Sequence, residues 1–590
     1  MSLDDFAARR SNSWVENLNE DPEAARYAPN KRSREVKSGH YVRVLPTPLP
    51  RPVLVMHSPD MVATLGLTEA AVADARFAKF FGGDAQALDL GASWATPYAL
   101  SIMGEPMFRN CPFGNGNGYG DGRAISVGEV VVPGGARWEL QLKGAGTTPF
   151  CRGADGRAVL RSSVREFLAS EAMFALGVPT TRALSLVSSG ETARRAWYSK
   201  TAGAGNGGVD ENDPRLASFP EPIRKRLVAQ LRAQLAGGTD PDVASDEQCA
   251  ITCRVAPSFL RVGHVDLFAR RAVSTGATPA QRDELWLLVK HACDREFPDA
   301  LADSRVDTAV NLVPRVAQAL ADLAANWIRV GFCQGNFNAD NCLISGRTMD
   351  YGPFGFIDKY DPLFAKWTGS GEHFAFMNQP GAAMANFNVF AKSLEPLAAS
   401  ADDRVRIQQA AREAAPLFRA ALEDVWRAKL GFSAPNPAAA KLFSDVDPLL
   451  RALDYTVFWR QLAVVAENFA PDQSDDELVA PLARALYADS WDEPLKAALA
   501  QWVRKWADSL GGDLASAPAR MNQSNPKYIL REWMLVAAYE AAQRGDFSVA
   551  KELQEICKKP YEDQAESVSD KYFRPAPKDE VNRPGTAFMT

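Results

Sequence analysis

The chain has 590 residues, enough for several domains and a large buried core, and 46% of them are hydrophobic and 23% charged, as in ordinary globular proteins. The net charge of −6 at pH 7 argues against a dedicated nucleic-acid-binding protein, and no apolar stretch is long enough to span a membrane. The eight cysteines include no Cys-x-x-Cys pair, and the five histidines show no metal-ligand spacing, which argues against a zinc site.

The N-terminal segment, residues 1–40, is polar and is expected to be poorly ordered. Asp4 and Asp5 interrupt any apolar core of a signal peptide, which favours a cytoplasmic protein. Arg9 and Arg10 are typical of a mitochondrial transit peptide, but such peptides avoid acidic residues. A mitochondrial location is therefore the alternative.

A glycine-rich stretch, Phe113–Arg123, has a glycine at every second position from Gly114 to Gly122. Glycine lets backbone N–H groups approach phosphates closely and adopt positive φ. The spacing does not fit Gly-x-Gly-x-x-Gly, so the stretch alone predicts a flexible hairpin tip. Together with the motifs that follow, it predicts a loop that covers phosphates and ends in Arg123.

The next two predicted elements are a strand and a helix. Arg137–Lys143 alternates apolar and polar residues, which predicts a strand that ends at Lys143. Apolar spacing after Ser163 predicts a helix that ends at Gly177, with Glu166 in its first turn. A strand lysine paired with a helix glutamate positions phosphates in kinases. Two alternatives stay open: Ser163 and Glu166 also fit a capping box, and Lys143 fits a solvated surface charge.

Farther along, Asp340 and Asn341 lie side by side, and Asp350 follows nine residues after Asn341 beyond a turn at residues 345–346. Mg²⁺ prefers such hard oxygen ligands together with substrate phosphates. Protein kinases take the same pair from an Asn and from the Asp of Asp-Phe-Gly, which here becomes Asp350-Tyr-Gly. A kinase also has its base Asp five residues before that Asn. Asn336 occupies this position, and an amide cannot accept a substrate proton.

Long strings of the sequence resemble the selenoprotein O family, also called YdiU, from about Trp14 to about Asn582. The strings that carry the resemblance are Gln141–Phe150, Asp155–Met173, Val178–Leu184, Arg254–Arg261, Asp350–Phe356 and Asn525–Arg531.

The resemblance implies an α+β fold of the two-lobed protein-kinase type, with a strand-rich N-lobe and an enlarged helical C-lobe. It implies an enzyme that binds ATP in a flipped orientation and transfers AMP, with release of pyrophosphate, to Ser, Thr or Tyr hydroxyls of protein substrates. Mg²⁺ is the implied cofactor, with Mn²⁺ as an alternative. A conventional kinase and a catalytically silent nucleotide-binding pseudokinase scaffold are the competing hypotheses, and Asn336 weighs against the kinase.

The resemblance also implies roles for residues that match the family's motifs. Asp340 would accept the proton of the acceptor hydroxyl, and Asn341 and Asp350 would bind the metal. Glu166 would form the ion pair with Lys143. The implied ATP contacts are Gly120, Gly122, Arg123, Lys143, Asp155, Gly156, Arg254, Arg261 and Asp350.

Two of these assignments have simpler alternatives, and the sequence departs from the family in several places. Arg254 and Arg261 are seven residues apart, so on a helix both would face the same way, but they also fit a pair of surface charges. The loop before the metal motif usually begins His-Gly-Val, whereas here it is Gln334-Gly-Asn. The stretch at about 201–248 is longer than usual and is interpreted as a surface insertion.

The predicted organisation has five parts. They are the segment 1–40, an N-lobe at 41–190, a linker or insertion at 191–250, a helical C-lobe at 251–570 and an extended tail at 571–590. Within the C-lobe, Pro314 suits a first helical position, and Pro416 should kink or split its helix. Apolar spacing predicts C-lobe helices at 313–330, 386–394, 404–429, 455–469, 493–510 and 529–543.

Overall fold

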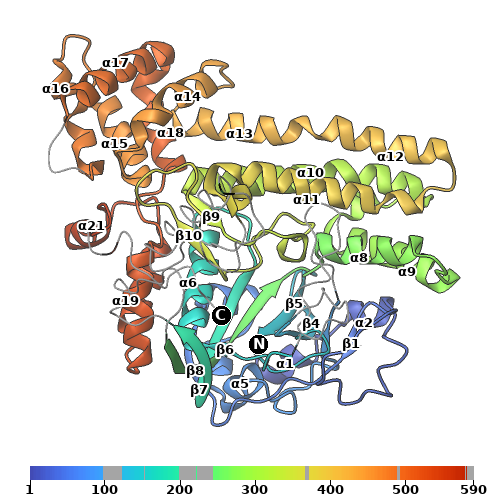
Figure 1. The fold of residues 1–590 in the computed structure, drawn as a ribbon. Coiled ribbons are helices and arrows are strands. Elements are labelled where there is room, and N and C mark those ends of the chain that lie inside the picture. The colour runs from blue at the N-terminus through green and yellow to red at the C-terminus, as the bar shows by residue number, and fades with distance from the viewer. Residues whose placement is uncertain are drawn as a thin grey trace.

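The computed structural model combines an antiparallel sheet with a larger set of helices, which confirms the predicted mixture of strands and helices (Figure 1). In the described part of the chain, no helix is both long and apolar enough to span a membrane. The residues that the structure describes are 1–97, 122–151, 153–197, 221, 243–365, 371–487, 492–577 and 580.

The strands of the main sheet lie in the order β1-β3-β4-β5-β8-β7-β2. Strand β6 also pairs with β8. All neighbouring strands in it are antiparallel. Its strands are β1 (Val42–Arg43), β2 (Val53–His57), β3 (Trp94–Ala95), β4 (Ala124–Val131), β5 (Arg137–Lys143), β6 (Ala158–Val159), β7 (Arg182–Trp197) and β8 (Val243–Ala256).

Strand β5 has the predicted bounds, whereas strand β8 was missed. Half of β8 falls within the predicted linker at 191–250, yet it lies between β5 and β7 near the middle of the sheet. Its later residues, such as Ile251, Cys253 and Val255, are fully buried. Most of the predicted insertion lies outside the described residues.

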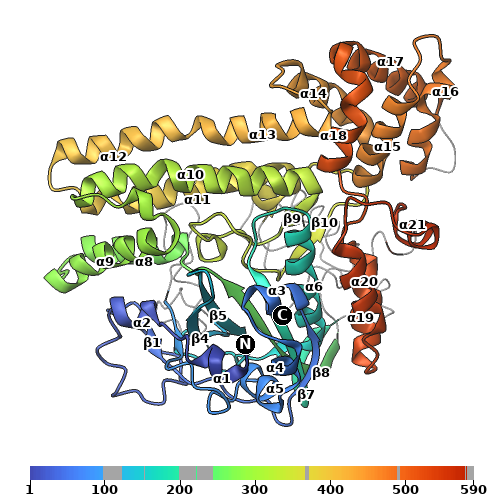
Figure 2. The same cartoon turned by 180° about the vertical axis from the view of Figure 1, so that it is seen from behind.

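Short N-terminal helices pack on one face of the sheet and helix 160–175 packs on the other, whereas the later helices extend away from the sheet, as Figures 1 and 2 show from opposite sides. The first of them precede or interrupt the strands: α1 (Leu3–Ala7), α2 (Ser13–Asn17), α3 (Pro59–Thr64), α4 (Glu69–Ala73), α5 (Ala75–Phe81) and α6 (Leu160–Ala175). The others follow the sheet: α8 (Val262–Val273), α9 (Pro279–Glu296), α10 (Arg305–Val330), α11 (Gln379–Ser393), α12 (Ala401–Ala414), α13 (Pro416–Lys429), α14 (Ala438–Leu450), α15 (Tyr455–Glu467), α16 (Asp475–Val479), α17 (Glu493–Leu510), α18 (Ala517–Ser524), α19 (Glu532–Gln543), α20 (Ser548–Cys557) and α21 (Glu566–Tyr572).

The two helix predictions that rested on prolines had opposite outcomes. Pro416 separates α12 from α13, as predicted, because a proline starts a helix more readily than it continues one. Pro314 does not start α10, which begins nine residues earlier at Arg305 behind the side-chain cap of Ser304. A cap and a continuous buried face outweigh one interior proline in this helix of 26 residues.

The expectation of a poorly ordered N-terminal segment was wrong. Residues 1–40 include α1 and α2, and the side chains of Phe6 and Trp14 are almost completely buried. The backbone N–H of Ser13 donates to the carboxylate of Glu129 on β4. Backbone hydrogen bonds to β4 and the burial of these two rings therefore attach the segment to the rest of the protein.

Two buried glutamates lie opposite each other in the sheet, Glu129 on β4 and Glu139 on β5. Burial and the negative charge of Glu129 raise the pKa of Glu139 to about 7, although a hydrogen bond from Ser126 and the charge of Arg295 oppose the rise. An acid that keeps its proton in the folded state up to about pH 7, and loses it near pH 4.5 when unfolded, costs stability as the pH rises between these values.

The free energy of unfolding of Glu139→Gln, relative to that of the wild type, is therefore expected to be higher at pH 8 than at pH 5. The expected increase is on the order of 1–3 kcal/mol. Urea unfolding at both pH values measures the difference. Glu477→Gln is the control: hydrogen bonds from Ser474 lower the pKa of Glu477, so this carboxylate is ionised in both the folded and the unfolded state, and its difference from the wild type should hardly change between pH 5 and pH 8. A difference between Glu139→Gln and the wild type that does not change with pH would contradict the prediction.

Candidate active site

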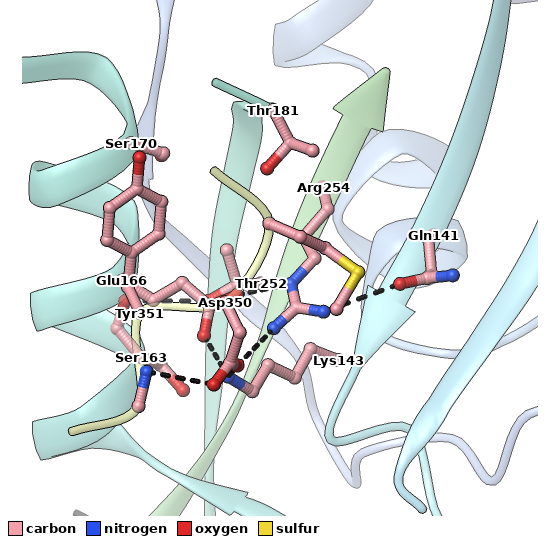
Figure 3. A network of polar contacts seen from close by, with 12 residues as sticks. Gln141, Lys143, Ser163, Glu166, Ser170, Thr181, Thr252, Arg254, Asp350 and Tyr351 are labelled. Atoms are coloured by element: carbon pink, nitrogen blue, oxygen red, sulfur yellow. Dashed lines mark hydrogen bonds and ion pairs between the residues drawn. The ribbon is translucent and has the colours of Figure 1, made fainter. Parts of the chain in front are cut away.

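Two cations and two carboxylates meet between the sheet and helix α6 (Figure 3). Lys143 Nζ contacts Glu166 Oε2 and lies 2.7 Å from Asp350 Oδ1. Arg254 Nε contacts Glu166 Oε1, and its Nη2 lies 3.0 Å from Asp350 Oδ1. Each cation thus bridges both acids. Lys143, Glu166 and Arg254 are buried and Asp350 is partly buried, with 4–16% of each side chain exposed, so these contacts are only weakly screened by water.

The sheet register explains why the two cations lie together. Arg254 on β8 lies opposite Gln141 on β5, two residues before Lys143. Side chains two residues apart point to the same face of a strand, so Lys143 and Arg254 share a face. Arg254 therefore belongs to a strand and Arg261 precedes α8, so the two do not share a helix face, which their spacing would have allowed on a helix. Neither is a surface charge, because both residues are at least 96% buried.

The structure decides between the two interpretations of Glu166. Helix α6 begins at Leu160, four residues before the predicted start, and its cap residue Val159 makes no side-chain hydrogen bond. Glu166 thus lies in the second turn, where a capping box is out of reach. Its two carboxylate oxygens contact Lys143 and Arg254 instead.

Asp350 is held in its ionised form. Burial acts to raise the pKa of this carboxyl group, but the charges of Lys143 and Arg254 outweigh burial and bring the pKa well below its ordinary value. The charge of Arg123 acts in the same direction. Both cations contact Oδ1, whereas Oδ2 accepts the backbone N–H of Gly352 at 3.3 Å.

Asp340, Asn341 and Asp350 lie on the connection between two short paired strands, β9 (Phe332–Gln334) and β10 (Phe354–Phe356). A 3₁₀ turn at Ala339–Asn341 carries Asp340, whose side chain is buried. The side-chain amide of Asn341 donates to the carbonyl of Asn336 at 3.0 Å, which leaves its oxygen as a ligand atom.

The turn expected at residues 345–346 is present, and it requires glycine. Gly346 has φ of +64°, and a Cβ there would lie 2.2 Å from the carbonyl oxygen of Ala319 on α10. Cys342 and Thr348 pair as a β-bridge on either side of the turn. The connection between Asn341 and Asp350 is thereby fixed against α10.

The other residues predicted to contact the nucleotide lie in different surroundings. Arg123 donates to the carbonyl of Arg157 at 3.1 Å, and Gly156 approaches Gly146 so closely that a Cβ would lie 2.1 Å from its backbone. Arg261 is buried and its Nε contacts the sulfur of Met349 at 3.1 Å. Gly122, with φ of +62°, precedes Arg123, whereas Gly120 and most of the glycine-rich loop lie outside the described residues.

Sequence reasoning missed two residues beside the predicted ones. Arg195 on β7 holds Asp155 with two hydrogen bonds of 2.8 Å. Gln334, where the family's loop begins with His, donates from its side chain to the backbone carbonyl of Asp350 at 2.5 Å. Its departure from the family pattern was the only signal in the sequence, whereas Arg195 gave none.

Comparisons with known proteins agree on one family. A family model described as protein adenylyltransferase SelO matches residues 24–204 and 233–558. A protein nucleotidyltransferase YdiU from Azoarcus sp. (strain BH72) is 35% identical over 572 residues, 96% of each chain. Two others, from Xanthomonas euvesicatoria pv. vesicatoria and Xanthomonas axonopodis pv. citri, are 37% and 36% identical over 90% and 94% of each chain.

Proposed function

The chain belongs to the SelO family of protein adenylyltransferases, and we propose that it transfers AMP from ATP to Ser, Thr or Tyr hydroxyls of other proteins at the centre formed by Lys143, Glu166, Arg254 and Asp350. The observation that carries this proposal is the pair of buried cations, each bridging the same two carboxylates. The sheet and the helices beyond it would then be the two lobes of a kinase-like fold. A strand lysine, a helix glutamate and an aspartate after a hairpin support this comparison.

The residues present fit Mg²⁺ or Mn²⁺. Asp350 is ionised and its Oδ2 is not engaged by either cation, and the amide of Asn341 is oriented so that its oxygen remains available. One carboxylate, one amide oxygen and substrate phosphates form the donor set typical of Mg²⁺. Asn341 and Asp350 would hold the metal, which when bound would supply charge neutralisation to the phosphates.

The cationic residues suit the leaving group of AMP transfer. The acceptor oxygen attacks the α-phosphorus of ATP, the bond to the β-phosphate oxygen breaks, and pyrophosphate leaves with its additional charge. Lys143 and Arg254 are already held in place by Glu166, so they need little reorganisation to stabilise that charge. Arg123 and Arg261, together with Gly120, Gly122, Asp155 and Gly156, would complete the ATP contacts.

Asp340 would accept the proton of the acceptor hydroxyl. It precedes Asn341 directly, so a base and a metal ligand come from the same 3₁₀ turn. Asn336, at the position of a kinase base, accepts two hydrogen bonds: its backbone carbonyl from the side-chain amide of Asn341 and its side-chain oxygen from that of Asn338. This use of Asn336 supports AMP transfer over the transfer of the γ-phosphate.

A cytoplasmic location, with the mitochondrion as the alternative, stays a prediction.

Labelled ATP tests the proposal directly. The full-length protein is incubated with Mg²⁺ and a protein mixture, once with α-³²P-ATP and once with γ-³²P-ATP. We expect label in protein from the α-phosphate only, and acid hydrolysis should recover it on Ser, Thr or Tyr. Label from the γ-phosphate alone would identify a conventional kinase, and ATP-dependent thermal stabilisation without either label would identify a silent scaffold.

A further inference from the structure

The C-terminal motif Asn525–Arg531 and helix α19, which follows it, have no part in the chemistry proposed above. In both views α19 lies alongside α6, the helix that carries Glu166 (Figures 1 and 2). The two helices are far apart in sequence, and their contacts connect the C-terminal region to the active site.

The first contact is an ion pair next to the catalytic centre. Arg165, the neighbour of Glu166 on α6, pairs with Glu532 at the start of α19. The same guanidinium donates to the carbonyl of Phe354 at 3.1 Å and lies 4.6 Å from the centre of its ring. Phe354 begins β10, four residues after Asp350. The Arg165 side chain is fully buried and thus connects three elements.

The residue before Glu532 holds the other end of β10. Arg531 makes two hydrogen bonds of 2.8 and 2.9 Å to Asp454, the cap of α15, and also contacts Asp358, two residues beyond β10. The Arg531 side chain is 1% exposed and that of Asp454 is fully buried. Arg531 and Glu532 together therefore attach the start of α19 to α6 and to both ends of β10.

A second connection, through a carboxylate on β8, joins the far end of α19 to α6. Gln543 donates to Glu247 on β8 at 2.8 Å, and the same carboxylate oxygen lies 4.0 Å from Arg161 Nε. Arg161 and Arg165 are four residues apart, so they share one face of α6. Helix α19 is thus linked to this face at two points, directly through Glu532 at its start and through Glu247 of β8 at its end.

We infer that α19 positions α6 relative to β10, so that Glu166 and Asp350 meet Lys143 and Arg254 at the correct distance. Arg165, Arg531 and Glu532 are positioning residues in this arrangement, and none of them contacts the reacting atoms. Because Arg165 and Glu166 are adjacent on one continuous helix, a shift at Arg165 would displace Glu166 as well. The inference rests on the proposed roles of Glu166 and Asp350.

Glu532→Gln tests the inference in the full-length protein, because it removes the charge that holds Arg165 and keeps the side chain's shape. Glu171→Gln is the matched control. Glu171 also lies on α6 and pairs with a buried arginine, Arg182 on β7, at 2.6–2.7 Å, but this pair contacts neither β10 nor α19. Both variants are assayed for AMP transfer well below their melting temperatures, where each is fully folded.

For Glu532→Gln we expect kcat/KM for ATP to fall roughly tenfold or more, since small displacements of catalytic groups have large effects on rate. We also expect faster hydrogen exchange in the first turns of α6 and in β10. Glu171→Gln should change kcat/KM by less than about threefold even if its melting temperature falls equally. If Glu532→Gln cannot be purified folded, Gln543→Ala should show the same changes to a smaller extent.

Equal kcat/KM in Glu532→Gln and Glu171→Gln, or unchanged exchange in α6 and β10, would overturn the inference. The wild type provides a separate check of the chemistry on which the inference rests. If it transfers no label from α-³²P-ATP, the proposed function fails. If the wild type and Glu171→Gln are active and Glu532→Gln is equally active, only the positioning role fails.

Discussion

Asp350→Ala is expected to abolish transfer of labelled AMP, with a loss of roughly a thousandfold or more in kcat/KM. Three consequences combine in this variant. The proposed metal site loses its only carboxylate, Lys143 and Arg254 lose a shared partner, and the positive charges beside Glu166 are no longer balanced. The measurement is the initial rate of protein labelling from α-³²P-ATP at several Mg²⁺ concentrations.

Two further variants separate these consequences. Asp350→Asn keeps the shape of the side chain, so its loss of activity reports the charge rather than a cavity. Asp361→Asn is the control, because Asp361 is exposed and its carboxylate only accepts the backbone N–H of Leu363 in a turn. This variant should transfer AMP at nearly the wild-type rate. Activity within a few-fold of the wild type in Asp350→Ala would show that the metal site is wrongly assigned.

The second large effect is expected for Asp340→Asn. Removing a general base typically lowers the rate by about 10²- to 10⁴-fold, and we expect that loss in kcat. KM for ATP should change little, because the proposed nucleotide contacts involve other side chains. This pattern differs from that of Asp350→Ala, for which nucleotide binding and turnover should both suffer. Steady-state kinetics with varied ATP separates the two.

Asn336→Ala is the matched control for the base. In a kinase the side chain at this position is essential, whereas here only its backbone carbonyl contacts Asn341. The variant should therefore retain transfer within a few-fold of the wild type. If Asn336→Ala is inactive and Asp340→Asn is active, the proton acceptor has been placed on the wrong residue.

The sequence was sufficient for local features and for matches to a strong motif. Alternation predicted strand β5 with the correct ends, and Pro416 predicted the break between α12 and α13. The contact between Lys143 and Glu166 was also expected, because the kinase comparison links a strand lysine to a helix glutamate. The start of α6 was placed four residues late, since Ser163 resembled a cap and the true cap, Val159, has no capping side chain.

Long-range pairing accounts for what was missed. The seven-residue spacing of Arg254 and Arg261 is compatible with one face of a helix, and only the register of β8 against β5 shows that Arg254 shares a face with Lys143. Glu532 is 367 residues from Arg165, and no local pattern marks either as a partner of the other. The burial of Trp14 in the polar N-terminal segment was also missed, because the residues that cover its ring are distant in sequence.

The sharing of Glu166 between Lys143 and Arg254 has a consequence for how this centre tolerates change. Because each of the four charged groups is neutralised by two others, the first substitution removes most of what the set provides, and a second adds little. The four positions form one epistatic unit. A lineage that lost any one of them would no longer be selected to keep the other three.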